Sequence, residues 1–188
     1  MDAFSYLSVL ISIVVGLALA HLLAGFAAMV RARARIAVYW PLVAQMALLF
    51  LLQVQMWWAF FGLRDVARWS FPEFLVVLMQ AVLVYLATAI LVPDVRDSDR
   101  LDLKECYYRE ARWYFAALML VVLDSLAKNL VLTGRFQNGT DLAGHVAFIS
   151  LCIAGIATRR ERVHKIIAIV ALVVFACYIA LLFVPLPD

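Results

Sequence analysis

Long apolar runs alternate along the chain with short stretches that carry most of the charged residues. A helix needs about 20 mainly apolar residues to cross the roughly 30 Å hydrocarbon core of a bilayer. Six runs come close to this length or exceed it, at residues 4–30, 37–62, 71–92, 111–132, 141–158 and 166–184. Backbone polar groups in lipid must be paired internally, so runs of this length predict helices. We therefore expect an all-α fold, a single domain over residues 1–188 that forms a bundle of six transmembrane helices.

The residues at the ends of these runs support the predicted boundaries. Ser70 and Glu73 have the spacing of a capping box at the start of the third helix. Gly134 stands where a residue in the left-handed conformation would end the fourth helix. Apolar and aromatic residues recur at helical spacing from Leu103 to Tyr114, so an earlier start of the fourth helix stays open.

Composition agrees with a membrane location. Hydrophobic residues make up 67% of the 188 residues and charged residues 15%, with a mean hydropathy of +0.98. Soluble domains are about half apolar and a quarter charged. A core of this size could not bury such an excess of apolar side chains, so the remainder is expected to face lipid. The sequence predicts an integral membrane protein whose first partner is the lipid bilayer.

The distribution of lysine and arginine predicts the orientation. Twelve of these residues lie in the first, third and fifth loops or beside them, four lie on the opposite side, and the two termini carry none. Cytoplasmic loops are enriched in basic residues, so we expect both termini on the outer, periplasmic side. The bias toward Ala, Leu and Arg suggests a bacterial inner membrane. The net charge of +3 arises from loops on one side, which does not favour nucleic acid as a partner.

Small residues form one continuous stripe on the first predicted helix. They recur every four positions, at Ser8, Ser12, Gly16, Ala20 and Ala24. Small side chains let helix backbones approach closely, which is a main source of helix association in lipid. We expect this helix to pack through the stripe, either at the centre of the fold or at a seam between subunits, and the intramolecular alternative is favoured.

Asp124 and Lys128 stand four residues apart on one face of the fourth predicted helix. A charged group in the membrane costs roughly 2.5–3.5 kcal/mol on insertion scales, so each needs a partner or a function. Two interpretations stay open. The residues form a mutually neutralising pair, with Lys128 reaching toward the outer headgroups, or they belong to a proton or ion site in an outer cavity.

Other polar side chains fall at a similar depth in the outer half of the predicted bundle. Gln53 and Gln55 point to different sides of their helix, so they cannot both line one cavity. His21 lies in the inner half of the first helix, beside the small-residue stripe. Glutamine side chains inside a helix bundle usually join helices by hydrogen bonds, which is the alternative to lining a cavity. The candidate cavity residues are Asp124, Lys128, Asn129, Gln53, Gln55, Gln80, His145 and His21.

Motifs with defined chemistry do not occur in the sequence. It has no G-x-S-x-G, no H-E-x-x-H and no paired intramembrane acids. His145 and Cys152 share a helix face but stand about 10 Å apart along it, too far for a base and a nucleophile. Three histidines at three depths and three scattered cysteines predict neither a metal site nor a cofactor. The sequence therefore does not favour an enzyme.

Two classes of function remain. The first is a small channel or carrier for ions, protons or a solute, with a polar cavity in the outer half and an oligomeric assembly. The second is a non-catalytic structural or assembly subunit of a larger membrane complex, in which polar residues only join helices. A homo-oligomer or other membrane subunits are the expected protein partners.

Overall fold

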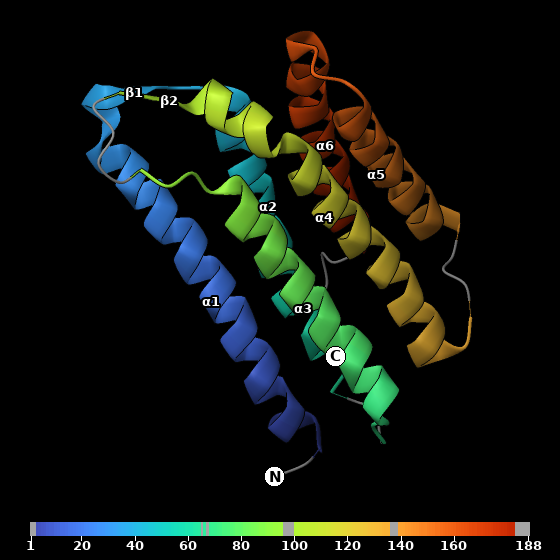
Figure 1. The fold of residues 1–188 in the computed structure, drawn as a ribbon. Coiled ribbons are helices and arrows are strands. Elements are labelled where there is room, and N and C mark those ends of the chain that lie inside the picture. The colour runs from blue at the N-terminus through green and yellow to red at the C-terminus, as the bar shows by residue number, and fades with distance from the viewer. Residues whose placement is uncertain (1–2, 65, 67, 96–99, 136–138, 183–188) are drawn as a thin grey trace.

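The computed structural model describes residues 3–64, 66, 68–95, 100–135 and 139–182. Six α-helices lie within these residues and run in alternating directions along one another (Figure 1). We call the end of the bundle that carries the two short strands the strand end, and the other the opposite end. The helices are α1 (Ala3–Arg31), α2 (Trp40–Phe61), α3 (Phe71–Leu91), α4 (Leu103–Thr133), α5 (Gly139–Ala157) and α6 (Glu161–Leu182).

Five of the helices, all except α5, are long and apolar enough to span a bilayer. The apolar part of α5, Asp141–Ala157, is shorter. Such helices are compatible with an integral membrane protein that crosses the bilayer several times. The sixth span and the orientation of the termini stay predictions.

Two of the predicted helix starts are corrected by the structure, and the earlier start that stayed open for the fourth helix is confirmed. Helix α4 begins at Leu103, and α6 begins at Glu161, before the predicted 166. Hydropathy marks only the lipid-embedded part of a helix, whereas these first turns are rich in charged residues and still helical. The Asp102 carboxylate accepts a hydrogen bond from the Lys104 N–H at 2.8 Å and caps α4. Helix α2 begins at Trp40 rather than 37, because a short strand precedes it.

That strand, β1 (Ile36–Ala37), pairs in parallel with β2 (Leu101–Asp102). A 3₁₀ turn at Arg33–Arg35 connects it to the end of α1. The two-residue pair is the one departure from an all-α fold within the described residues, and it ties the first loop to the start of α4.

Two predicted helix ends are confirmed. The Ser70 N–H donates to Glu73 Oε2 at 2.6 Å, and the Glu73 N–H donates to Ser70 Oγ at 3.4 Å, which completes the capping box of α3. Gly134 follows α4 with φ 65°, in the left-handed region that glycine adopts without strain.

Helix α4 lies at the centre of the bundle, between α3 and α5 (Figure 1). Helix α3 also packs against α1, and α6 packs against α5 and α2. Toward the strand end, Tyr107, Tyr114 and Phe115 of α4 are at most 2% exposed and join one large apolar core. A second cluster around Val77 and Val121 fills the space between α1, α2, α3 and α4 toward the opposite end.

Helix α1 does not pack through its small-residue stripe. Ser12, Gly16, Ala20 and Ala24 are exposed and Ser8 is half-buried. The buried face carries Ile11, Val15, Ala18 and Leu22 instead. The favoured expectation that the stripe packs inside the fold is therefore corrected, since larger side chains on another face fill the contact with α3. A seam between subunits stays a prediction.

Candidate functional site

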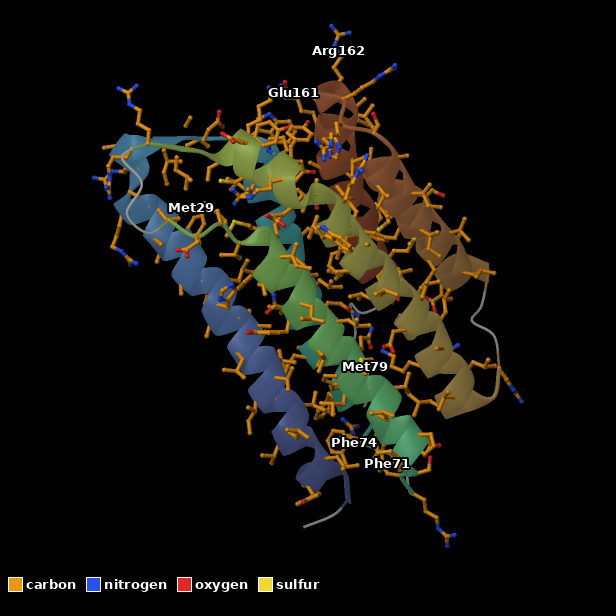
Figure 2. All side chains as sticks on the ribbon, viewed as in Figure 1. Met29, Phe71, Phe74, Met79, Glu161 and Arg162 are labelled. Carbon is orange, nitrogen blue, oxygen red and sulfur yellow. The ribbon has the colours of Figure 1, made fainter. Side chains whose placement is uncertain are left out.

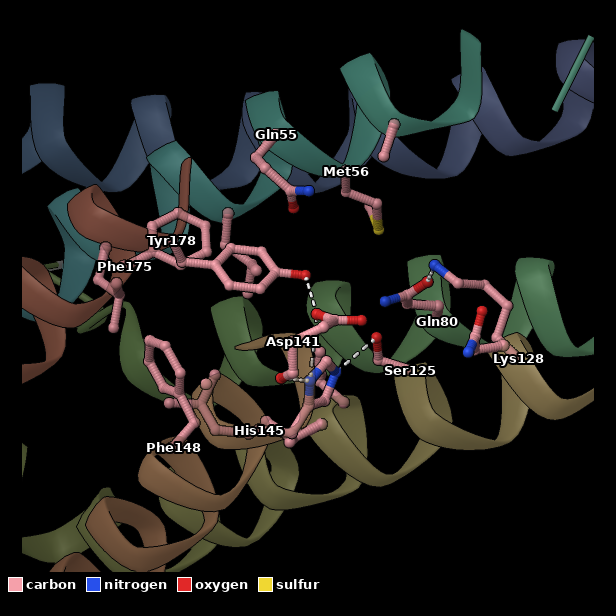
Figure 3. A pocket seen from close by; sticks show the side chains of 18 of the residues that line it. Gln55, Met56, Gln80, Ser125, Lys128, Asp141, His145, Phe148, Phe175 and Tyr178 are labelled. Carbon is pink, nitrogen blue, oxygen red and sulfur yellow. Dashed lines mark hydrogen bonds and ion pairs between the residues drawn. The ribbon is translucent and has the colours of Figure 1, made fainter. Parts of the chain in front are cut away.

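A cavity of about 250 Å³ lies among α2, α3, α4, α5 and α6 in the half of the bundle toward the opposite end (Figure 3). Its walls include the end of α2, the last turns of α4 and the first turn of α5. Five of the predicted site residues line it: Gln55, Gln80, Lys128, Asn129 and His145. Ser125, Asp141 and Tyr178 also line it and were not expected.

The Lys128 ammonium has a neutral partner. Its Nζ donates to Gln80 Oε1 on α3 at 2.5 Å (Figure 3). In the part of the chain that the structure describes, Asp124 forms no ion pair with Lys128, and its buried Oδ2 has no hydrogen-bond partner. Asp124 is not among the cavity-lining residues either. Of the two interpretations that stayed open, the structure does not form the mutually neutralising pair, because Lys128 reaches across to the neighbouring helix.

His145 is the centre of a hydrogen-bond network that joins three helices (Figure 3). Its Nδ1 lies 2.8 Å from the Asp141 carbonyl oxygen, and its Nε2 lies 3.1 Å from Ser125 Oγ on α4. A carbonyl oxygen only accepts, so Nδ1 donates to it, and Nε2 forms a hydrogen bond with the Ser125 hydroxyl, which can donate or accept. Tyr178 of α6 donates to Asp141 Oδ1 at 2.9 Å.

The chain of contacts from Ser125 through His145 to Asp141 resembles a catalytic triad of a nucleophile, a base and the acid that orients the base. However, the Asp141 carboxylate oxygen is 3.6 Å from Nδ1, and Nδ1 is bonded to the backbone carbonyl instead. Ser125 also lies inside α4, where backbone N–H groups are used by the helix and cannot stabilise an oxyanion. The arrangement suits hydrogen bonding between helices better than acyl transfer.

Besides Asp124, two of the predicted residues lie elsewhere. Gln53 is fully buried and donates from Nε2 to Thr88 Oγ1 of α3 at 3.2 Å, away from the cavity. His21 is exposed on α1, with its ring 6.4 Å from that of Tyr85, and it lines a separate groove near the strand end. The site therefore combines some of the predicted residues and not others.

Two of the missed residues had a signal in the sequence. Asp141 and His145 stand four residues apart, and so share a helix face. Ser125 stands three residues before Lys128 and therefore lies on the same side of α4. The apolar pattern of α6 gives no indication that Tyr178 would turn toward Asp141.

The large core closes the cavity toward the strand end. Tyr114 is fully buried there and donates from its hydroxyl to Gln45 Oε1 at 2.9 Å. Phe115 packs against α5 at Gly155, where the missing side chain leaves room for the ring. Within the described residues, no group of three or more His, Cys, Asp or Glu side chains could hold a metal ion.

Comparisons with models of protein families, with curated proteins and with solved structures give no match for this chain.

Proposed function

We propose that the protein is a small carrier that takes up a solute into the cavity from the outer side of the membrane. The observation that carries the proposal is a cavity with eight polar lining residues, contributed by five helices. Polar groups inside a membrane are costly and commonly mark a solute or ion pathway. The proposal includes the predicted orientation, in which the opposite end faces the periplasm of a bacterial inner membrane.

The closed core favours a carrier over an open channel. A channel needs a continuous polar path, whereas buried Tyr107, Tyr114 and Phe115 fill the bundle on the strand side of the cavity. A carrier exposes its binding site to one side at a time, so closure on one side fits that cycle. The fold then corresponds to the state that is loaded from the opposite end.

The cavity walls indicate the kind of solute. Its volume of about 250 Å³ is at the lower end of the usual range for ligand sites, which favours a small molecule. Lys128, with a neutral amide as its partner, provides a cationic contact for an anionic group. Leu118, Phe148 and Phe175 line the same cavity and provide apolar surface. A small amphipathic anion, such as a carboxylate with an apolar body, matches these features best.

The test combines binding and transport by the purified full chain. A panel of monocarboxylates, amino acids and inorganic ions is screened for thermal stabilisation, and the positive solutes are then measured by counterflow in proteoliposomes. We expect Lys128→Gln to abolish both effects. Lys165→Gln is the matched control, because Lys165 pairs with Glu161 at 2.8 Å near the strand end, outside the cavity. Absence of binding and counterflow in the wild type across the panel would contradict the proposal.

A second function, an assembly subunit, is favoured by the exposed stripe of α1. A Cβ added at Gly16 would meet nothing within 4 Å, so this surface is open for a neighbouring helix. Cysteine crosslinking from Ser12→Cys in native membranes tests this function. Crosslinks to unrelated chains would support the subunit function, and crosslinks between identical copies would support a homo-oligomer.

A further inference from the structure

A second concavity lies near the strand end, between the last turns of α1 and the end of α3. It has a volume of about 570 Å³, and its lining runs along α1 from His21 to Arg31. Ten residues of helix correspond to about 15 Å, so the groove is much longer than a headgroup contact alone requires. The walls are small and apolar, formed by Ala24, Gly25, Ala28, Ala89 and Val92.

Close packing of the two helices explains the floor of this groove. A Cβ at Gly25 would overlap the side chain of Val92, so glycine is what lets α1 approach the end of α3 here. Between His21 and Arg31, the other wall residues from α1 are Ala24 and Ala28, which leave space beside the contact. The groove is therefore a property of the backbone arrangement and not of a single flexible side chain.

The rim of the groove is basic. Arg31 and Arg35 line it and are exposed. Within the described residues neither guanidinium has an ion pair or a side-chain hydrogen bond. Asp94 contributes one acidic group to the same rim. Two positive charges therefore stand against one negative charge among the described rim residues.

Local structure holds these arginines in place. The Arg35 N–H donates to the Ala32 carbonyl at 2.8 Å, and Ile36 pairs with Leu101 directly afterwards. The β1–β2 pair therefore fixes the backbone that carries Arg35, at the level where α1 ends. The backbone that positions Arg35 is therefore already ordered before a phosphate binds.

We propose that this groove binds an anionic phospholipid, with the phosphate at Arg31 and Arg35 and an acyl chain along the alanine wall of α1. Guanidinium groups bind phosphate oxygens by charge-assisted hydrogen bonds. Basic pockets between helices at the cytoplasmic face are suited to anionic lipid headgroups. A soluble phosphate compound would use the rim and leave the apolar wall uncovered. The proposal does not depend on the solute cavity, which shares no lining residue with the groove.

The experiment measures lipid binding to the full chain in detergent and in phosphatidylcholine nanodiscs. Phosphatidylglycerol is titrated against phosphatidylcholine with the same acyl chains, while inorganic phosphate and glycerol 3-phosphate serve as headgroup probes without chains. Each basic residue near an anionic surface contributes about a five-fold factor, so we expect the double variant Arg31→Gln, Arg35→Gln to bind phosphatidylglycerol about 25-fold more weakly.

The matched control is the double variant Arg159→Gln, Arg160→Gln. It removes the same charge from exposed arginines at the same end but outside the groove. A third variant, Ala28→Trp, fills the groove while both arginines remain, and it should also weaken phosphatidylglycerol binding. Equal melting temperatures in phosphatidylcholine establish that each variant folds.

Three results would overturn the proposal. The first is equal affinity of the wild type for the two lipids. The second is an equal loss in the groove and control variants, which would indicate diffuse surface attraction. The third is binding of glycerol 3-phosphate as tight as that of phosphatidylglycerol, which would indicate a soluble ligand. Loss of phosphatidylglycerol binding in the groove variants alone supports the proposal.

Discussion

Gly155→Ala tests the packing that closes the cavity toward the strand end. The new Cβ would lie 2.5–2.6 Å from three ring atoms of Phe115. Carbon atoms in contact prefer about 3.5–4.0 Å, so α5 and the ring must separate by roughly 1 Å. Phe115 is 2% exposed and lies within the large apolar core, so its ring can move only if neighbouring side chains move too. Overpacking of this kind costs about 1–3 kcal/mol, and the better helix propensity of alanine returns only about 0.5–1 kcal/mol.

The net expectation is a loss of up to about 2.5 kcal/mol in the free energy of unfolding. Unfolding of the purified protein in mixed micelles with increasing dodecyl sulfate measures it. Gly16→Ala is the control, because its Cβ would meet nothing within 4 Å and helix propensity alone should make it neutral or slightly stabilising. The smaller side chain in Phe115→Leu should relieve the clash, so the double-mutant cycle should show a favourable coupling. The reasoning is refuted if Gly155→Ala is as stable as Gly16→Ala, or if the coupling is zero.

Three other substitutions test the rest of the structure. Gly16→Leu should leave the unfolding free energy of the monomer within about 0.5 kcal/mol of wild type, because the site is exposed. It should reduce any self-association, measured by crosslinking, if the stripe is a seam. Asp124→Asn should change stability by less than about 1 kcal/mol, whereas breaking a buried ion pair costs about 3–5 kcal/mol. Mixed-micelle unfolding distinguishes these results, and a loss in the larger range would reinstate the pair. Arg33→Cys should react with an impermeant thiol reagent only after the cytoplasmic side is opened, and labelling of intact cells would reverse the proposed orientation.

Hydropathy was sufficient for the number and order of helices, since each apolar run either spans lipid or lies in the core. Hydropathy alone did not mark the start of α4, but the helical spacing of buried Leu103 and Tyr107 did indicate it. The β1–β2 pair was beyond reach, because two residues carry no measurable period. This pair depends on a contact between segments far apart in the sequence.

For the site, the depth of each polar residue was predictable but its direction was not. Successive residues on a helix differ by about 100°, so Asp124 and Ser125 lie at nearly the same depth and face different neighbours. The structure directs Ser125 toward His145, while Asp124 does not line the cavity. The stripe of α1 shows the same limit. Small residues permit close packing, but only the positions of Ile11 and Val15 reveal which face is used.

The cavity proposed for solute binding and the α1 surface proposed for assembly lie on different parts of the molecule. The cavity is lined by α2 to α6, and none of its lining residues comes from α1. Helix α1 lies at one side of the bundle (Figure 2), where it packs on α3 and α2. Its small-residue face is left mostly exposed. Association through that face would therefore bury the stripe without covering the cavity walls or displacing Lys128. Solute binding and assembly can coexist in one molecule, and substitutions at Gly16 and Lys128 should affect the two properties independently.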